Sequence, residues 1–314
     1  MKFSVTIPAY KARFLKECIE SILAQTYKDF ELIIVNDASP EDLTSIVKSF
    51  NDPRIRYYIN ETNCGAVNVV DNWNKCLEYA TGEYIICMGD DDMLAENALQ
   101  TYNDLICKYP NVDLFHSRTM AIDEKGFSVA LMLIRNEYES LCNFMLYRFF
   151  PHNGNMQFIG DFCFRTTTLR KVGGFYKLPL AWESDDITAF MVANPNGVVH
   201  TAHPTFFYRI NGQTITNTGN VEIKLESTDK AYLWYKNFLT SYSPVNVLEQ
   251  QLLLQIKQNL DSFFTKKKIH IIASDIAQNV FHSFKWIFHK NSYNLSSVLV
   301  LQSIAKGIVD SIKH

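Results

Sequence analysis

The sequence has no long apolar run, no paired-cysteine motif and no excess of one charge. No stretch reaches the roughly 18 apolar residues of a membrane span, and the N-terminus has no apolar core of a signal peptide. The seven cysteines are odd in number and show no C-x-x-C spacing, which argues against disulfides or zinc. The net charge of −3 and pI of 6.2 argue against a nucleic-acid partner. We therefore expect a cytoplasmic globular protein.

The sequence also lacks the usual phosphate-binding glycine motifs. No G-x-G-x-x-G follows the first apolar run, and no G-x-x-x-x-G-K-S/T occurs anywhere in the chain. A bound phosphate would therefore have to be held by side chains and a metal ion rather than by a glycine cradle.

What the sequence does contain is an alternation of short apolar runs with amphipathic segments. The runs are near-continuous, as in strands that are buried on both faces, and crossover helices separate them. This pattern predicts an α/β fold with a mostly parallel sheet flanked by helices. The expected strands are 3–7, 30–35, 55–59 and 84–88, and the expected helices are 14–23, 43–50 and 67–79.

Three polar segments each follow one of these strands: 8–10, 36–37 and 90–92. In open α/β sheets ligands bind beyond the carboxyl ends of the strands, so the three segments should line one cleft. Asp90, Asp91 and Asp92 would repel one another there unless a divalent cation were bound. The alternative is an acidic turn that caps a helix beginning near Ala95.

In order along residues 3–212, the sequence resembles the family 2 inverting glycosyltransferases, which have the GT-A fold. A helical appendage would follow this fold. The matching segments are Val5-Thr6-Ile7-Pro8-Ala9-Tyr10, Phe30 to Ser39, Asn63-Cys64-Gly65, Ala80 to Ile85, the aspartate triplet with Met93-Leu94, and Val172-Gly173-Gly174-Phe175.

The resemblance implies a nucleotide-diphosphate-sugar site with Mn²⁺ or Mg²⁺. Asp37 matches the carboxylate that pairs with the base, and the triplet matches the family's D-x-D. The other nucleotide-binding positions that it implies are Pro8, Ala9, Tyr10 and Asn63.

The chain departs from the family at two positions. Gly89 stands where the first aspartate of D-x-D is expected, so Asp91 should bind the metal, and Asp90 or Asp92 should take over the vacated role. We assign Asp92 with Asp91 to the metal and Asp90 to the nucleotide. Trp73 replaces an arginine of many relatives, and either Lys75 substitutes for it or the contact is absent.

Sugar transfer also needs a base, because the acceptor hydroxyl must lose a proton as the leaving group departs. Asp185 is the candidate, with Asp186 and Glu183 as alternates; the alternative is that these acids only begin a helix. Downstream, Arg209 matches an aromatic-arginine segment and either reaches the diphosphate or forms a surface ion pair. The aromatic segment 138–164, which includes 151–155, has the composition of an acceptor-side wall.

From residue 221 the pattern becomes helical, which predicts a catalytic domain at 1–220 and a helical region at 221–314. Between residues 266 and 314 seven lysines stand against two aspartates, a balance of +5. Residues 284–290 mix aromatic and basic side chains, as in helices that lie on a membrane. The alternatives are an appendage packed on the catalytic domain or a homodimer contact.

These observations favour transfer of a sugar, from UDP in the first instance, to a glycan or lipid-linked acceptor in cell-surface polysaccharide synthesis. A sugar-nucleotide nucleotidyltransferase would share the sheet and the acidic site but should carry a glycine-rich basic loop after the first strand. A non-catalytic sugar-nucleotide binder would follow if Gly89 marked a failed metal site.

Overall fold

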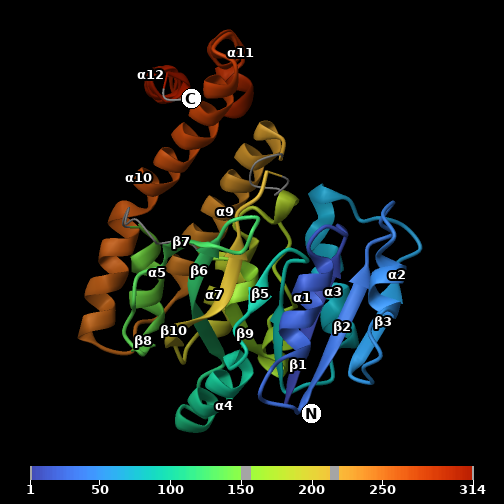
Figure 1. Ribbon diagram of the computed structural model, residues 1–314. Helices are drawn as coiled ribbons and strands as arrows, with labels where there is room; N and C mark the ends of the chain where they lie inside the picture. The colour runs from blue at the N-terminus through green and yellow to red at the C-terminus, as the bar shows by residue number, and fades with distance from the viewer. Residues whose placement is uncertain (1, 150–156, 213–218, 313–314) are drawn as a thin grey trace.

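A computed structural model describes residues 2–149, 157–212 and 219–312, and shows a central sheet with helices on both faces (Figure 1). The strands run in the order β3-β2-β1-β4-β9-β6-β10-β5, with β7 beside β6 and β8 beside β10. Their bounds are β1 Phe3–Ala9, β2 Phe30–Asn36, β3 Ile55–Ile59, β4 Tyr84–Cys87, β5 Met93–Leu94, β6 Leu114–Ile122, β7 Ser128–Leu131, β8 Tyr138–Glu139, β9 Phe162–Arg165 and β10 Val198–Arg209.

The first half of the sheet is parallel, as expected. Strand β1 lies between β2 and β4, and Phe3 is in register with both Phe30 and Tyr84. The carboxyl ends of these strands therefore lie at one edge, where the polar segments at 8–10, 36–37 and 90–92 meet. The α/β fold class predicted from the sequence is confirmed.

The second half of the sheet is mixed. Strand β9 is antiparallel to both β4 and β6, whereas β10 is parallel to β6 and antiparallel to β5 and β8. Strand β10 is long, so it contains His200 and His203 as well as the aromatic-arginine segment that ends at Arg209. These pairings bring Arg209 next to the segment that follows β4.

Helices cover both faces because successive strand residues point to opposite sides. Leu32 and Ile34 pack against one group of helices, and Ile33 and Val35 against the other. The first face is covered by α1 Leu15–Leu23, α2 Leu43–Lys48 and α4 Ala98–Lys108; the second by α3 Val69–Tyr79, α5 Leu141–Phe149, α6 Thr166–Lys171 and α7 Ser184–Ala193, together with parts of α9 Val221–Ser241 and α10 Val247–Gln278.

The C-terminal helices join the main core at one end and leave it at the other. Tyr235 of α9 and Phe264 of α10 belong to the cluster beneath the sheet, whereas Ile272 and Ile276 pack in a separate small cluster with Trp286. That cluster joins the end of α10 to α11 His282–Phe288 and α12 Ser297–Ser311, far from the sheet (Figure 1). The predicted division at residue 220 therefore crosses a continuous core. Among the described residues, none of the helices combines the length and apolarity that a bilayer crossing requires.

Candidate active site

A cavity of 440 Å³ opens at the edge where the parallel strands end. It brings together most of the side chains that the sequence assigned to the nucleotide, so we call it the donor cavity. The predicted residues that line it are Pro8, Tyr10, Asp37, Asn63, Asp90 and Asp91. Ala9 is fully buried in β1 and contributes instead through its carbonyl oxygen, which accepts a hydrogen bond from the Asp37 amide at 2.9 Å.

The Asp37 carboxylate is held in place by three hydrogen-bond contacts from the segment between β3 and α3. Its Oδ1 accepts from Asn60 Nδ2 at 2.8 Å and from the Cys64 amide at 3.0 Å, and its Oδ2 lies 3.1 Å from the same amide. A carboxylate so constrained at the end of β2 is a rigid acceptor, which suits the predicted role of base recognition.

Each aspartate of the triplet makes a different contact. Asp90 Oδ2 accepts the amides of Tyr10 and Lys11, both at 2.7 Å, and so shapes the loop after β1. Asp91 Oδ2 accepts from Asn211 Nδ2 at 2.7 Å, and Asp92 Oδ1 accepts the Arg209 amide at 2.9 Å. None of the three caps a helix, because α4 begins at Ala98 after Asn97, which makes no side-chain capping bond. The capping alternative is therefore wrong.

The triplet carries more negative charge than its surroundings balance. Burial and the neighbouring Asp91 raise the pKa of Asp90 to about 6, and the same two causes raise the pKa of Asp92 well above its usual value. A cation bound among these oxygens would relieve both effects. A Cβ atom at Gly89 would lie 2.9 Å from Asp91 Oδ1 and 2.9 Å from Asp92 Oδ2, so those two oxygens border the same small space.

These contacts fit a hard cation held by few protein ligands. Among the residues that the structure describes, no group of three or more His, Cys, Asp or Glu side chains is arranged around a metal position. Asp91 and Asp92 could supply carboxylate oxygens, and Mg²⁺ in nucleotide sites usually takes its other ligands from phosphates and water. The residues present are compatible with Mn²⁺ or Mg²⁺ bound together with a diphosphate.

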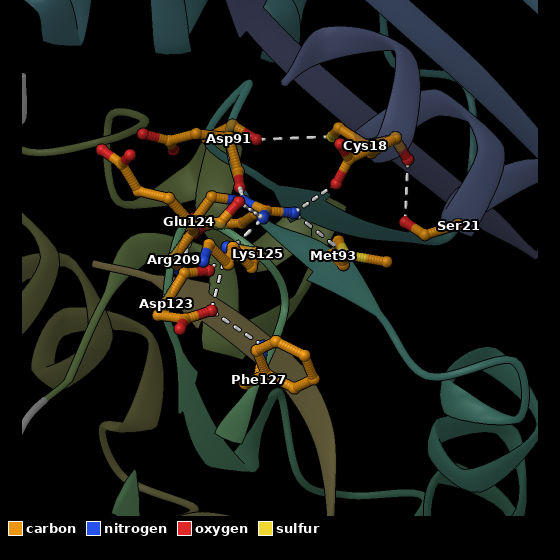
Figure 2. Close-up of polar contacts among 12 residues, drawn as sticks. Cys18, Ser21, Asp91, Met93, Asp123, Glu124, Lys125, Phe127 and Arg209 are labelled. Atoms are coloured by element: carbon orange, nitrogen blue, oxygen red, sulfur yellow. Dashed lines mark hydrogen bonds and ion pairs between the residues drawn. The ribbon is translucent and has the colours of Figure 1, made fainter. Parts of the chain in front are cut away.

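Arg209 does not line the donor cavity, contrary to the prediction that it reaches the diphosphate. Its side chain is 1% exposed and stacks on Phe14 with a guanidinium-to-ring distance of 4.3 Å. Its nitrogens donate to Glu17 Oε2 at 2.7 Å and to the carbonyl oxygen of Asp91 at 2.8 Å, and Nη1 also donates to the carbonyl oxygens of the Asp123–Glu124 turn (Figure 2). Arg209 therefore holds the aspartate loop from behind, where its hydrogen-bonding capacity is already used.

Lys75 is a second correction. It lies on α3 but does not line the donor cavity, because the side of α3 that faces the cavity carries Val69, Asn72 and Trp73. Trp73 therefore occupies the wall where a cation was expected, and Lys75 does not replace it there.

A second cavity, of 590 Å³, adjoins the first. Trp73, Gly89, Ile159 and Tyr208 line both, so the two cavities share a wall, and we call the second the acceptor cavity. Burial, Asp92, Asp91 and Asp185 all raise the pKa of the Tyr208 phenol, which places that side chain between the triplet and the second acidic cluster. All three candidate bases line the acceptor cavity.

The structure separates the three candidate bases. Asp186 is buried and accepts two hydrogen bonds from Arg148, at 2.6 and 2.9 Å, and Glu183 is paired with Lys267. Asp185 forms no ion pair with any described residue, and burial with the nearby Asp186 raises its pKa well above the usual value. The cluster does begin α7, with Asp185 and Asp186 in its first turn, so the helix-start interpretation holds for the backbone. Asp185 is therefore the one of the three acids that no described cationic side chain holds; its Oδ1 accepts the Asp186 amide at 2.9 Å.

The segment 138–164 was expected to form a wall of the acceptor site. Its residues 151–155 lie outside the described residues, and 141–149 form α5 rather than a loop. Phe149, Gln157 and Phe158 do line the acceptor cavity.

Sequence reasoning missed the contribution of α10. Lys266, Lys267 and His270 line the acceptor cavity together with the acidic cluster, although they lie more than 70 residues beyond it in the chain. Their spacing predicts that they share one face of the helix, but the sequence does not indicate which part of the protein that face packs against.

Comparisons with known proteins agree with this geometry. The sequence model described as Glycosyl transferase family 2 matches residues 4–173. The Campylobacter jejuni protein named GalNAc(5)-diNAcBac-PP-undecaprenol beta-1,3-glucosyltransferase is 37% identical over 103 residues, which are 32% of this chain and 33% of that protein. Streptococcus pneumoniae glycosyltransferase GlyG is 37% identical over 101 residues, 31% of this chain and 33% of that protein. The matched part thus spans about a third of these relatives' length.

Among solved structures, Staphylococcus aureus TarS 1-349 in complex with UDP-GlcNAc matches with a TM-score of 0.68 and 16% identity, over 100% of this chain and 91% of that one. At this identity the likeness establishes the shared fold. Because the family model covers more than half of the chain, and because the cleft after β1, β2 and β4 holds the residues expected of it, the protein belongs to glycosyl transferase family 2.

Proposed function

We propose that this protein is a metal-dependent inverting glycosyltransferase that moves a sugar from a nucleotide diphosphate to an acceptor hydroxyl. The observation that carries the proposal is the pair of adjoining cavities. Asp91 lines one of them and the unpaired Asp185 lines the other, with Tyr208 in both. Inversion requires the base to act on the face opposite the leaving group, and the two cavities offer such opposite sides.

The chain's own residues would share the work as follows. Asp37 and the loop at 8–10 bind the nucleotide, and Asp91 with Asp92 would hold Mn²⁺ or Mg²⁺. When bound, the cation stabilises negative charge on the departing diphosphate. Asp185 takes the proton of the acceptor hydroxyl, and its raised pKa suits a base that must compete for that proton.

Uridine is the nucleoside that we propose for the donor. The fixed Asp37 carboxylate can accept the imide N–H of uracil. TarS, which has the same fold, is described in complexes with UDP-GlcNAc and with UDP.

Donor binding in the presence and absence of metal tests this function. UDP should bind at least about tenfold more tightly with Mg²⁺ than with chelator, and Asp91→Asn should remove most of the difference. Asp71→Asn is the matched control, since Asp71 is on the nearby helix α3 and pairs with Lys177 instead of lining the cavity. A panel of nucleotide sugars with Mn²⁺ would then identify the donor by slow hydrolysis. Equal UDP affinity with and without metal would contradict the proposal.

For the acceptor we propose a glycan or lipid-linked sugar of cell-surface polysaccharide synthesis, reached from the cytoplasmic face of the membrane. Helix α12 exposes an apolar stripe at Val298, Leu301, Ile308 and Ile312. Phe281, Phe284 and Phe288 are exposed on and before α11, within a segment of net positive charge. Exposed aromatic side chains beside lysines suit an anionic bilayer surface.

Vesicle binding tests this membrane contact without removing helices that share the core. Phe284→Ser with Phe288→Ser should reduce binding to phosphatidylglycerol vesicles while donor hydrolysis is unchanged. Phe127→Ser is the control, because Phe127 is equally exposed but lies in the β6–β7 turn. Unchanged vesicle binding, with the chain forming a dimer through the same face, would favour a homodimer contact instead.

A further inference from the structure

The wall that α10 contributes to the acceptor cavity is a single helical face. Phe263, Lys266, Lys267, His270 and Ile271 all line the cavity. Their spacing of three and four residues places them on neighbouring turns of one side of the helix. Two apolar side chains therefore flank three basic ones along this wall of the cavity, and Lys267 pairs with Glu183 of the acidic cluster.

The charges of this cavity do not all cancel. Arg148 is paired with Asp186, and Lys267 is paired with Glu183. Lys266 forms no hydrogen bond or ion pair with any part of the chain that the structure describes, although it lines the cavity. Lys266 and His270, one turn apart, thus form a basic end that makes no ion pair with a carboxylate of the described residues.

Buried polar atoms in the same cavity also lack partners. Gln157 is 7% exposed, and among the described residues neither its amide oxygen nor its amide nitrogen has a hydrogen-bond partner. The indole N–H of Trp182 is likewise buried and without a partner. Unpaired buried donors and acceptors are costly, so their presence on a cavity wall points to a ligand that supplies the missing hydrogen bonds.

From these observations we propose that the acceptor carries a phosphoryl group, which Lys266 and His270 bind at the α10 end of the cavity. This inference rests on the proposed transferase function. The acceptor sugar lies between that end and Asp185, with its hydroxyls and amides bonded to Gln157 and Trp182. A phosphoryl group, with several oxygens and up to two charges, suits two basic side chains on adjacent helical turns.

His270 can report on occupancy. Burial lowers its pKa, Lys306 of α12 lowers it further, and Asp310 of α12 opposes this. Lys306 and Asp310 pair with each other at 2.8 Å, and Lys266 and Lys267 are the other charged groups that α10 places nearby on the cavity face. A bound phosphoryl group would favour the protonated imidazole, so the pKa of His270 should rise on binding.

The experiment follows His270 by NMR in protein with labelled histidine, with the donor cavity first filled by UDP and Mg²⁺. The probes are inorganic pyrophosphate, a short-chain alkyl N-acetylglucosaminyl diphosphate and the neutral alkyl N-acetylglucosaminide. The two phosphoryl probes should raise the pKa of His270 by roughly one unit, and the neutral glycoside should not. Lys266→Ala should weaken binding of the phosphoryl probes roughly tenfold or more, and Lys266→Arg should restore it.

The matched control is Lys268→Ala, which removes the same charge from the same helix. Lys268 pairs with Asp229 and does not line the cavity, so this variant should bind the probes as the wild type does. Vesicles of phosphatidylglycerol form a further arm: a His270 response to them would identify a lipid headgroup as the source, and a response only to the glycosyl diphosphate would identify the acceptor itself.

The inference is overturned if the phosphoryl probes leave His270 unchanged, or if Lys266→Ala and Lys268→Ala bind them equally. Hydrolysis of the nucleotide sugar is measured on the same variants. Its persistence in a protein that ignores the probes would refute only the phosphoryl site, whereas its absence from the wild type would refute the transferase function.

Discussion

The donor and acceptor cavities are neighbours with a common wall, yet they are assembled differently. Apart from Ile159 and Tyr208, the donor cavity is built within residues 8–91, by segments that each follow a parallel strand. The acceptor cavity combines α3, the aspartate loop, α5, the start of α7, β10 and α10. The donor side therefore depends on local connections of a repeated βα unit, and the acceptor side depends on how distant helices pack.

The two sides also differ in what is buried beneath them. The parallel strands under the donor cavity are mostly apolar, and the buried Glu31 carboxylate of β2 is paired with Arg56 and accepts a hydrogen bond from Ser4. Beneath the acceptor side, His116 and His200 lie with their Nδ1 atoms 3.0 Å apart, and each Nε2 approaches a carboxylate, of Asp161 and Glu139 respectively. The acceptor side thus packs on a buried polar network that contains two histidines, so the protonation of this network depends on pH.

The largest expected effect is a loss of sugar transfer on changing the acceptor cavity, with no loss of nucleotide binding in the donor cavity. Asp185→Asn preserves shape but removes basicity, so sugar transfer should fall by roughly 10²–10⁴-fold while UDP binding is unchanged. Steady-state transfer and calorimetric UDP titration measure the two quantities. Near wild-type transfer by Asp185→Asn, with inactive but folded Asp186→Asn or Glu183→Gln, would move the base to a neighbouring residue.

The next largest effect is expected from changing Arg209, the residue that joins the aspartate loop to β10. Arg209→Gln removes a buried guanidinium that bonds Asp91 and Glu17, so the free energy of unfolding should fall by about 3 kcal/mol. Chemical denaturation measures this loss. Arg13→Ala, which breaks an exposed pair with Glu124 and a contact with the Phe14 ring, should change it by less than about 1 kcal/mol. A loss of similar size in both variants would mean that Arg209 does not support the loop.

Acid should weaken the acceptor side first. Burial lowers the pKa of His200 to about 3, so the folded protein holds this imidazole neutral, whereas the unfolded chain protonates it near pH 6.5. Since the unfolded state binds the extra proton, stability falls as pH drops below 6.5. The expected loss is about 2 kcal/mol by pH 5.

Denaturation at pH 7.5 and pH 5 measures this dependence, and His200→Gln should reduce it. The pKa of Glu139 is held at about 2 because hydrogen bonds from His200 and Arg135 outweigh the effect of burial, so its contribution is lost only below about pH 4.3. A wild-type stability that does not change between pH 7.5 and 5 would contradict this account.

The smallest expected effect is that of changing Gly89, which stands in place of the first aspartate of the D-x-D motif. A Cβ there would approach the carboxylate oxygens of Asp91 and Asp92, so Gly89→Ala should shift the loop at a cost of about 1–2 kcal/mol and weaken UDP binding with Mg²⁺. Calorimetry with and without Mg²⁺ is the measurement. Gly126→Ala, in an open turn at positive φ, is a control that should change stability but not metal-dependent binding. Tighter binding by Gly89→Ala would contradict this account, because it would show that the loop accommodates a side chain at this position.

The sequence predicted correctly the positions of site residues that directly follow a strand. The segments after β1, β2 and β4 were placed at one cleft because parallel strands must end at the same edge, and the structure agrees for Asp37, Asp90 and Asp91. The prediction was wrong for Arg209 and Lys75. Whether a cationic side chain points into the cavity or bonds to other protein groups depends on residues that are distant in the sequence and become neighbours only in the fold. Glu17, for example, attracts Arg209 from a helix 192 positions away.

The sequence by itself therefore determined the α/β class, the donor edge and the acidic cluster that contains the proposed base, since apolar periodicity and strand-end residues are local properties of the chain. Only the tertiary structure decided which of three neighbouring acids remains unpaired. Arg148 from α5 and Lys267 from α10 neutralise Asp186 and Glu183, and those partners become neighbours only when the helices pack. The same packing places Lys266 and His270 in one cavity with Asp185, because residues of a helical face can share a site with distant residues only after the helix packs against them.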